Sequence, residues 1–263
     1  MNKYILFGAA LAILVPVAAS AQTIFDGSWK ADVKSAQMPK KPDVYVLQGG
    51  MYQCKTCVPL IEVKADGADH MVTGHPYYDS VAIKVVNDHT VQETDKKAGK
   101  VVATSTTVVA ADGKSLTFDF KDSSNTSAAP VTGKVTQTKV ADGPAGSASI
   151  SGSWRTTNIE GISDNGLTVT FKVDTGVLKM STPTGQSYAA KIDGPEAPFK
   201  GDPGVTTVTI KKTGPRTLVE TDMRSGKVIS IATMTVDAAG KAMKVDVDNK
   251  LQGNTLAYTA TKQ

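Results

Sequence analysis

The chain carries the stretch ETDKKAGKVVATSTTVV at residues 93–109, and a closely similar stretch, ETDMRSGKVISIATMTV, follows at residues 220–236. Each stretch begins with the same tripeptide, passes through a glycine turn and continues as a run rich in β-branched residues. Such runs on either side of a glycine turn are typical of β-hairpins. The repeated stretch therefore predicts the same hairpin twice in the chain.

The similarity extends well beyond this hairpin. Residues 64–120 align with residues 191–247 at a constant spacing of 127 residues without a gap, and more than a third of the aligned positions are identical. Upstream, GSWK at residues 27–30 faces GSWR at residues 152–155, at a spacing of 125. A repeat of this length indicates that one structural unit occurs twice.

The two copies set the expected domain boundaries. The first unit is predicted at residues 22–140 and the second at residues 152–263. Between them, residues 141–151 read ADGPAGSASIS, which contains mostly small residues and no apolar periodicity. This composition is typical of a linker.

The pattern within each copy predicts an all-β fold. Short β-branched runs are separated by turn residues, and each copy has room for about eight strands of ordinary length. Short antiparallel strands expose two edges unless the sheet closes on itself. We therefore expect two tandem antiparallel up-and-down β-barrels.

Both copies open with a Gly-x-Trp motif, which contains Trp29 in the first copy and Trp154 in the second. The motif, followed by antiparallel hairpins, resembles that of the lipocalin or calycin barrels, and the first opening is also similar to a family of uncharacterised exported bacterial domains. The resemblance implies that each tryptophan plugs the closed end of a barrel. It also implies that Lys139 and Lys262, near the ends of the copies, lay a cation over that ring. Core packing accounts for both tryptophans as well, and the resemblance brings no activity with it.

The N-terminus predicts export. Residues 1–21 contain one lysine, an apolar run and a small-residue end, Ala-Ser-Ala, which together are typical of a secretory signal peptide. Gly8 and Pro16 interrupt the run, so we expect cleavage before Gln22 rather than a membrane span. The mature protein is accordingly expected to be periplasmic or secreted.

Composition and motifs argue against several classes of function. Without residues 1–21 the chain has 28 basic and 25 acidic residues, with no long basic block, so nucleic-acid binding is not expected. The sequence contains no nucleophile elbow, phosphate loop, dinucleotide fingerprint or metalloprotease motif. It therefore lends no support to enzymatic activity, indicates no cofactor and leaves the oligomeric state open.

The chain has only two cysteines, Cys54 and Cys57. In an oxidising compartment a pair at this spacing forms a disulfide, exchanges redox equivalents or binds a metal. At the repeat spacing they face Ser181 and Thr184, in a segment whose composition is typical of a hairpin turn. We therefore favour a structural disulfide at a loop tip, with a metal or redox role, or free thiols, as the alternatives.

All three histidines, His70, His75 and His89, belong to the first copy. Cys54, Cys57, His70 and His75 match the spacing of a zinc finger, but a finger needs both histidines on one helix, and here Gly74 and Pro76 interrupt that segment. A site made of His75 and the cysteines is the remaining alternative. Exposed loop histidines are the simpler interpretation.

The shared Glu-Thr-Asp tripeptide places Glu93 with Asp95, and Glu220 with Asp222. Paired carboxyl groups are also used in acid–base catalysis. Lysine and arginine follow in the adjoining turns, so we expect cross-strand charge pairs on the solvent face of each hairpin instead.

The sequence thus favours an exported, non-enzymatic protein that binds a small apolar ligand in the interior or the mouth of a barrel. Barrels of this size either hold one small molecule or are filled by side chains. One alternative is a metal-handling or thiol-redox protein that uses Cys54, Cys57 and His75. The other is a structural or interaction protein of the cell envelope with dry barrels.

Overall fold

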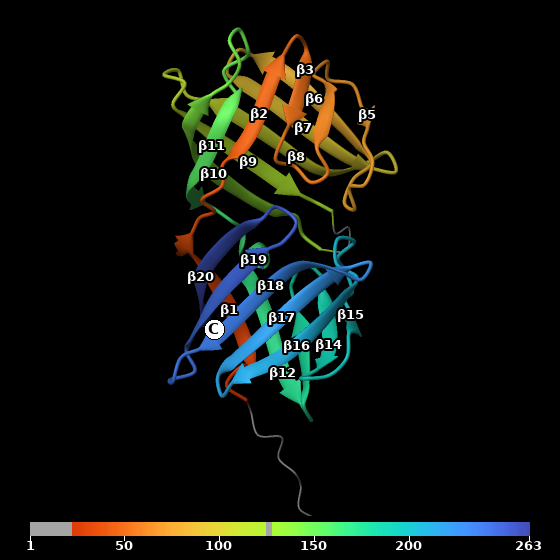
Figure 1. The fold of residues 1–263 in the computed structure, drawn as a ribbon, viewed down its shortest axis with the longest axis vertical. Helices are drawn as coiled ribbons and strands as arrows, with labels where there is room; N and C mark the ends of the chain where they lie inside the picture. Colours follow the sequence, from red (N-terminus) through yellow and green to blue (C-terminus); the bar gives the residue numbers. More distant parts are fainter. Residues whose placement is uncertain (1–22, 125–127) are drawn as a thin grey trace, which may run out of the picture.

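The computed structural model describes residues 23–124 and 128–263, so the predicted signal peptide at residues 1–21 lies outside the described residues. In this part of the chain, two ten-stranded antiparallel sheets each curl into a nearly closed barrel, and the two barrels are stacked along the long axis of the molecule (Figure 1). The predicted all-β, two-barrel fold is confirmed. Each sheet contains ten strands, however, rather than about eight.

Neighbouring strands of the first barrel are mostly consecutive in sequence. In sheet order the strands are β4 (Ile61–Lys64), β3 (Met51–Cys54), β2 (Asp43–Gln48), β11 (Gly152–Glu160), β10 (Val131–Asp142), β9 (Ser115–Asp122), β8 (Lys100–Val109), β7 (Thr90–Lys97), β6 (Ser80–Asn87) and β5 (His70–Met71). An isolated bridge from Asp66 to Lys84 links the two ends of this sheet.

The second barrel repeats this plan. Its strands in sheet order are β14 (Ser187–Lys191), β13 (Val177–Ser181), β12 (Thr168–Asp174), β1 (Gly27–Gln37), β20 (Asn254–Lys262), β19 (Ala242–Asn249), β18 (Lys227–Val236), β17 (Thr217–Arg224), β16 (Thr207–Gly214) and β15 (Ala197–Pro198). A bridge from Ile192 to Ile210 links its two ends. Among the described residues the single helix is α1 (Asp164–Leu167).

The two repeats exchange their opening strands. Strand β1 of the first repeat lies between β12 and β20 of the second barrel, and β11 of the second repeat lies between β10 and β2 of the first barrel. Trp29 pairs with Lys262, and Trp154 pairs with Lys139. The exchange is therefore reciprocal and places equivalent residues in equivalent positions.

The barrels consequently depart from the predicted repeat boundaries at these two strands. Residues 141–151 do not separate the barrels, because they connect β10 to β11 within one sheet, and Ile150 is buried in its core. The chain instead passes between barrels at residues 38–42 and 161–167. The physical reason is that both opening strands carry nearly the same tetrapeptide, so either sheet accepts either strand, and the sequence pattern does not distinguish the two arrangements.

Each tryptophan fills the closed end of a barrel. Trp29 and Trp154 have no exposed surface, and each indole N–H donates a 2.8 Å hydrogen bond to a backbone carbonyl four residues earlier, that of Phe25 or Ile150. Buried side chains of two core clusters surround the rings. Both tryptophans thus serve as core residues.

A lysine covers each of these rings, as the lipocalin resemblance implied. The Lys262 Nζ atom lies 4.9 Å from the centre of the Trp29 ring, and the Lys139 Nζ atom lies 4.8 Å from that of Trp154. A cation at this distance is attracted by the negative face of the indole. Because of the strand exchange, each lysine covers the tryptophan of the other repeat.

The open ends of the two barrels face each other. Trp154 pairs with Lys139, near the end of β10, whereas Val131 at the start of β10 lines a pocket shared with the second barrel. In the second barrel Lys262 is likewise at the end of β20, while Gln252, just before β20, lines another shared pocket. The tryptophan-filled ends therefore point away from the contact between the barrels.

Candidate functional site between the barrels

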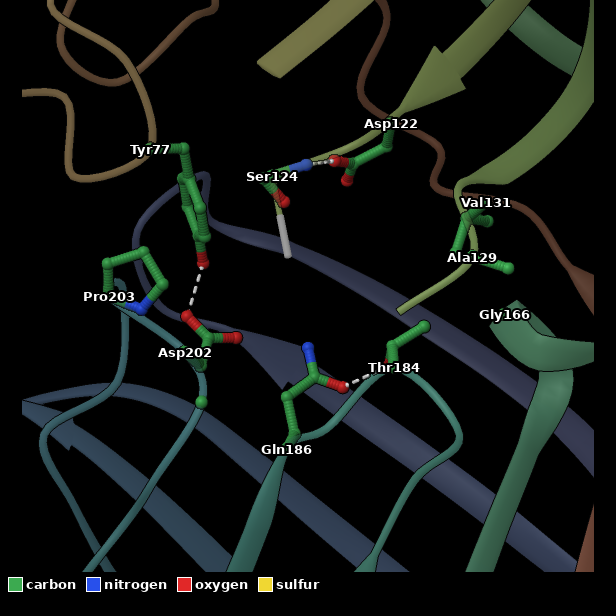
Figure 2. A pocket seen from close by; sticks show the side chains of 11 residues that line it. Tyr77, Asp122, Ser124, Ala129, Val131, Gly166, Thr184, Gln186, Asp202 and Pro203 are labelled. Atoms are coloured by element: carbon green, nitrogen blue, oxygen red, sulfur yellow. Dashed lines mark hydrogen bonds between the residues drawn. The ribbon is translucent and has the colours of Figure 1, made fainter. Parts of the chain in front are cut away.

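Two pockets lie between the barrel mouths, and each is lined by residues of both barrels. The first, here called the acidic pocket, has a volume of about 200 Å³ (Figure 2). It is lined by Tyr77, Asp122, Ser124, Ala129, Val131, Gly166, Thr184, Gln186, Gly201, Asp202 and Pro203. The second, here called the His75 cleft, has a volume of about 360 Å³ and is lined by Cys57, Val58, His75, Pro76, Tyr77, Tyr78, Arg224, Ile229, Ser230, Asn249, Leu251 and Gln252.

The duplication relates these two pockets. At the repeat spacing of 127, Cys57 corresponds to Thr184, and His75 corresponds to Asp202. Strand register confirms a further equivalence, because Asp122 pairs with Ala103 in the first barrel as Asn249 pairs with Ser230 in the second. The His75 cleft therefore has a histidine and an asparagine where the acidic pocket has two aspartates.

The acidic pocket holds a compact set of internal hydrogen bonds, which Figure 2 shows. The Tyr77 hydroxyl donates to Asp202 Oδ1 over 2.9 Å, and the Ser124 amide donates to Asp122 Oδ1 over 2.8 Å. Burial and the neighbouring Asp202 raise the pKa of Tyr77, so this hydroxyl stays protonated at neutral pH. The polar groups of this pocket thus already engage one another.

The His75 cleft has more apolar walls. Val58, Tyr77 and Leu251 are 47%, 38% and 39% exposed, although all three are large apolar or aromatic side chains. Small-molecule sites are typically concave and apolar, with a few polar groups that fix the orientation of the ligand. The cleft matches this description.

His75 is the buried polar group of the cleft. Its side chain is packed against Tyr78, with ring centres 4.7 Å apart, and the residue is only 8% exposed. Burial lowers the pKa of the imidazole, which is therefore neutral at neutral pH. Within residues 23–124 and 128–263 its Nε2 atom has no hydrogen-bond partner, and a buried polar atom without a partner is costly.

The predicted disulfide is present and borders this cleft. Cys54 ends β3, Cys57 lies in the following turn, and their sulfurs are bonded. Cys57 and His75 line the same cleft, as the alternative with a shared site required. The bonded sulfurs offer no thiolate to a metal, however, and in the described part of the chain no group of three or more potential ligands comes together.

The other two histidines lie elsewhere. His70 Nε2 is 2.8 Å from Asp66 Oδ1 in the segment that connects β4 to β5. His89 is exposed in the turn between β6 and β7. The zinc-finger spacing therefore does not correspond to a common site, and His75 alone among the histidines belongs to the cleft.

The Glu-Thr-Asp carboxyl groups point into the barrels, so the expectation of solvent-face charge pairs was wrong. Glu93 and Asp95 alternate along β7 with the buried residue Val91, and they pair across the sheet with the fully buried residues Ile83 and Val81. The second barrel repeats this arrangement with Glu220 and Asp222. In the described part of the chain none of the four carboxyl groups forms an ion pair with a lysine or arginine.

Burial changes the acidity of both carboxyl pairs. Removal from water raises the pKa of Glu93 to about 8, an effect that the adjacent Asp95 reinforces, and burial raises the pKa of Asp95 to about 6. Glu220 and Asp222 behave in the same way. Each pair thus retains a proton at neutral pH, as expected for adjacent carboxyl groups in a low-dielectric interior.

Hydrogen bonding in these pairs is incomplete. The Tyr188 hydroxyl donates to Glu220 Oε2. Asp95 Oδ1 and Asp222 Oδ1 are buried, and neither has a partner among the described residues. Because both repeats carry the same pair, we assign it to the common scaffold rather than to the chemistry that distinguishes the first repeat.

Neither a protein-family model nor a curated protein matches this chain. Among the described residues, no helix has the length and apolar character needed to cross a membrane.

Proposed function

We propose that this protein is a non-enzymatic binding protein that holds one small, largely apolar molecule in the His75 cleft. The observation that carries the proposal is the difference between the two interbarrel pockets. The same scaffold forms both, but one is acidic and internally hydrogen-bonded, whereas the other has apolar walls and a buried imidazole nitrogen without a partner. The two pockets differ at equivalent positions of the repeats, where His75 replaces Asp202 and Asn249 replaces Asp122.

The mouths suit a ligand better than the barrel interiors. Core side chains occupy the interior around each tryptophan, and a partly protonated carboxyl pair lies between that core and the mouth. A larger groove of about 580 Å³ lies beside Phe25 and Leu218. Its described lining includes Thr23, Ile24 and Pro215, and it lies apart from the mouths that face each other.

We also propose export to the periplasm or the exterior and a lipocalin-like ancestry. The composition of residues 1–21 supports export, and so does the disulfide, because such bonds persist in oxidising compartments. The tryptophan and lysine at each closed end support the lipocalin-like ancestry.

Uptake of the neutral dye N-phenyl-1-naphthylamine tests the proposed site. We expect the dye to bind the native protein with a stoichiometry of one, and Leu251→Asp to weaken binding at least about tenfold, since it places a charge on an apolar wall. Fluorescence titration measures both quantities.

The matched control is Ser124→Asp, because Ser124 occupies the position in the acidic pocket that corresponds to Leu251. This variant should bind the dye as the native protein does. Absence of dye binding by the native protein, together with an empty organic extract of the purified protein, would contradict the proposed function and favour a structural role.

A further inference from the structure

We propose that the molecule held in the His75 cleft is an apolar carboxylate whose charged group faces Arg224. This inference rests on the proposed function and adds the chemical class of the ligand.

Arg224 is the charged group of the cleft. Of the described residues that line it, Arg224 is the only one with a formal charge when His75 is neutral. It ends β17, and its Nε atom donates a 2.8 Å hydrogen bond to the carbonyl of Gly204, which fixes one edge of the guanidinium. The guanidinium is planar and presents further donors to a second partner.

Within residues 23–124 and 128–263 Arg224 forms no ion pair. Asp202, two residues before the Gly204 carbonyl that holds Arg224, directs Oδ1 toward the Tyr77 hydroxyl and the Gly204 amide in the acidic pocket. A half-buried guanidinium without a carboxylate partner favours an anion, because charge-assisted bidentate hydrogen bonds are among the strongest polar contacts in proteins.

Comparison of the repeats supports a preference for anions. The His75 cleft has His75 and Asn249 where the acidic pocket has Asp202 and Asp122, so two carboxylates are missing from the side on which Arg224 lies. The described lining of the His75 cleft thus combines an arginine with no carboxylate, which makes it complementary to a negative group.

The remaining walls define the rest of the ligand. Val58, Tyr77 and Leu251 offer apolar surface, and the volume of about 360 Å³ accommodates a bicyclic aromatic or a medium-length aliphatic skeleton. The ligand class is therefore an apolar acid with one carboxylate, rather than a multiply charged metabolite.

The test compares 2-naphthoate with its neutral analogue 2-naphthamide by titration calorimetry. We expect the native protein to bind the acid at least about tenfold more tightly, and added salt to reduce this preference, since the contact is electrostatic. Arg224→Gln should abolish the preference, so that the variant binds 2-naphthoate and 2-naphthamide with equal affinity.

The matched control is Lys97→Gln, which removes one positive charge from the equivalent position of the first repeat. It should leave the preference for 2-naphthoate unchanged. Circular dichroism shows whether Arg224→Gln folds. If it does not fold, Arg224→Lys replaces it and should keep the preference for 2-naphthoate, because the positive charge remains. Added salt should weaken the same preference in the native protein.

The three probes distinguish failure of the carboxylate assignment from failure of the proposed function. Equal affinity for 2-naphthoate and 2-naphthamide in a protein that takes up the neutral dye would overturn the assignment of a carboxylate and leave the proposed function standing. Absence of binding for all three probes would overturn the proposed function itself.

Discussion

The protein will be more stable at pH 5 than at pH 9. Burial raises the pKa of Glu93 and Glu220 to about 8 and that of Asp95 and Asp222 to about 6, whereas the unfolded chain loses these protons near pH 4. Between these values the folded state binds more protons than the unfolded state. The free energy of unfolding should therefore fall as the pH rises from about 4 to about 8.

Urea unfolding at constant ionic strength measures this dependence. We expect a total decrease on the order of several kcal/mol across the window, because each unit of pKa difference corresponds to about 1.4 kcal/mol and water reaches the half-buried carboxyl groups. The double variant Glu93→Gln with Glu220→Gln should flatten the profile and be more stable than the native protein at pH 9.

The control exchanges two exposed glutamates, Glu62 and Glu160, for glutamine. That double variant should keep the native pH profile. A native protein whose stability increases from pH 5 to pH 8 would contradict the inward placement of the two carboxyl pairs.

Truncation of Trp29 should destabilise the second barrel, to which the first repeat contributes its opening strand, β1. Trp29→Ala removes a fully buried indole from the core of the second barrel, together with its hydrogen bond and its contact with Lys262. Removal of a buried tryptophan costs about 3–5 kcal/mol. Hydrogen exchange should accordingly accelerate in β12 to β20 before it does so in β2 to β10.

The reciprocal variant, Trp154→Ala, should loosen the first barrel in the same way, because Trp154 lies in its core. The pair of variants therefore tests the strand exchange directly. Faster exchange in β2 to β10 on truncation of Trp29 would show instead that each repeat keeps its own opening strand.

Much of the fold follows from the repeat. Conservation of the pattern between residues 64–120 and 191–247 was sufficient to predict duplicated hairpins and closed β-sheets, and hence two barrels. The spacing of Cys54 and Cys57, together with the turn composition opposite them, favoured the disulfide that the structure contains. These features depend on local patterns and on comparison of the two copies, both of which the sequence contains.

The strand exchange could not be predicted in this way. Trp29 and Trp154 stand in nearly identical tetrapeptides, so the cores of both barrels accept either strand. Which barrel each opening strand joins depends on the connections at residues 38–42 and 161–167. The hydrophobic pattern of the sequence does not predict the paths of these connections.

The inward carboxyl pairs were not predicted, because charged side chains are usually exposed, even though strand alternation places these on the buried face. Val91, Glu93 and Asp95 occupy alternate positions of one strand, and alternate residues share a face of a sheet. The same parity places Glu220 and Asp222 on the face of Leu218. Alternation from the apolar residue was the signal that could have revealed them.

The His75 cleft was only partly foreseeable. The sequence indicated that His75 could approach the cysteine loop, but Arg224 belongs to the other repeat and joins the site only because the barrel mouths face each other. The alignment of the repeats shows that His75 stands opposite Asp202 and that Asn249 stands opposite Asp122. Only the facing barrel mouths reveal that these residues line two separate pockets.

A crystal structure of the complex with 2-naphthoate tests the central claim most directly. We expect one molecule between the barrels, with its rings against Tyr77 and Leu251 and its carboxylate hydrogen-bonded to Arg224. A molecule inside either barrel, or an empty cleft under conditions in which calorimetry shows binding, would contradict it.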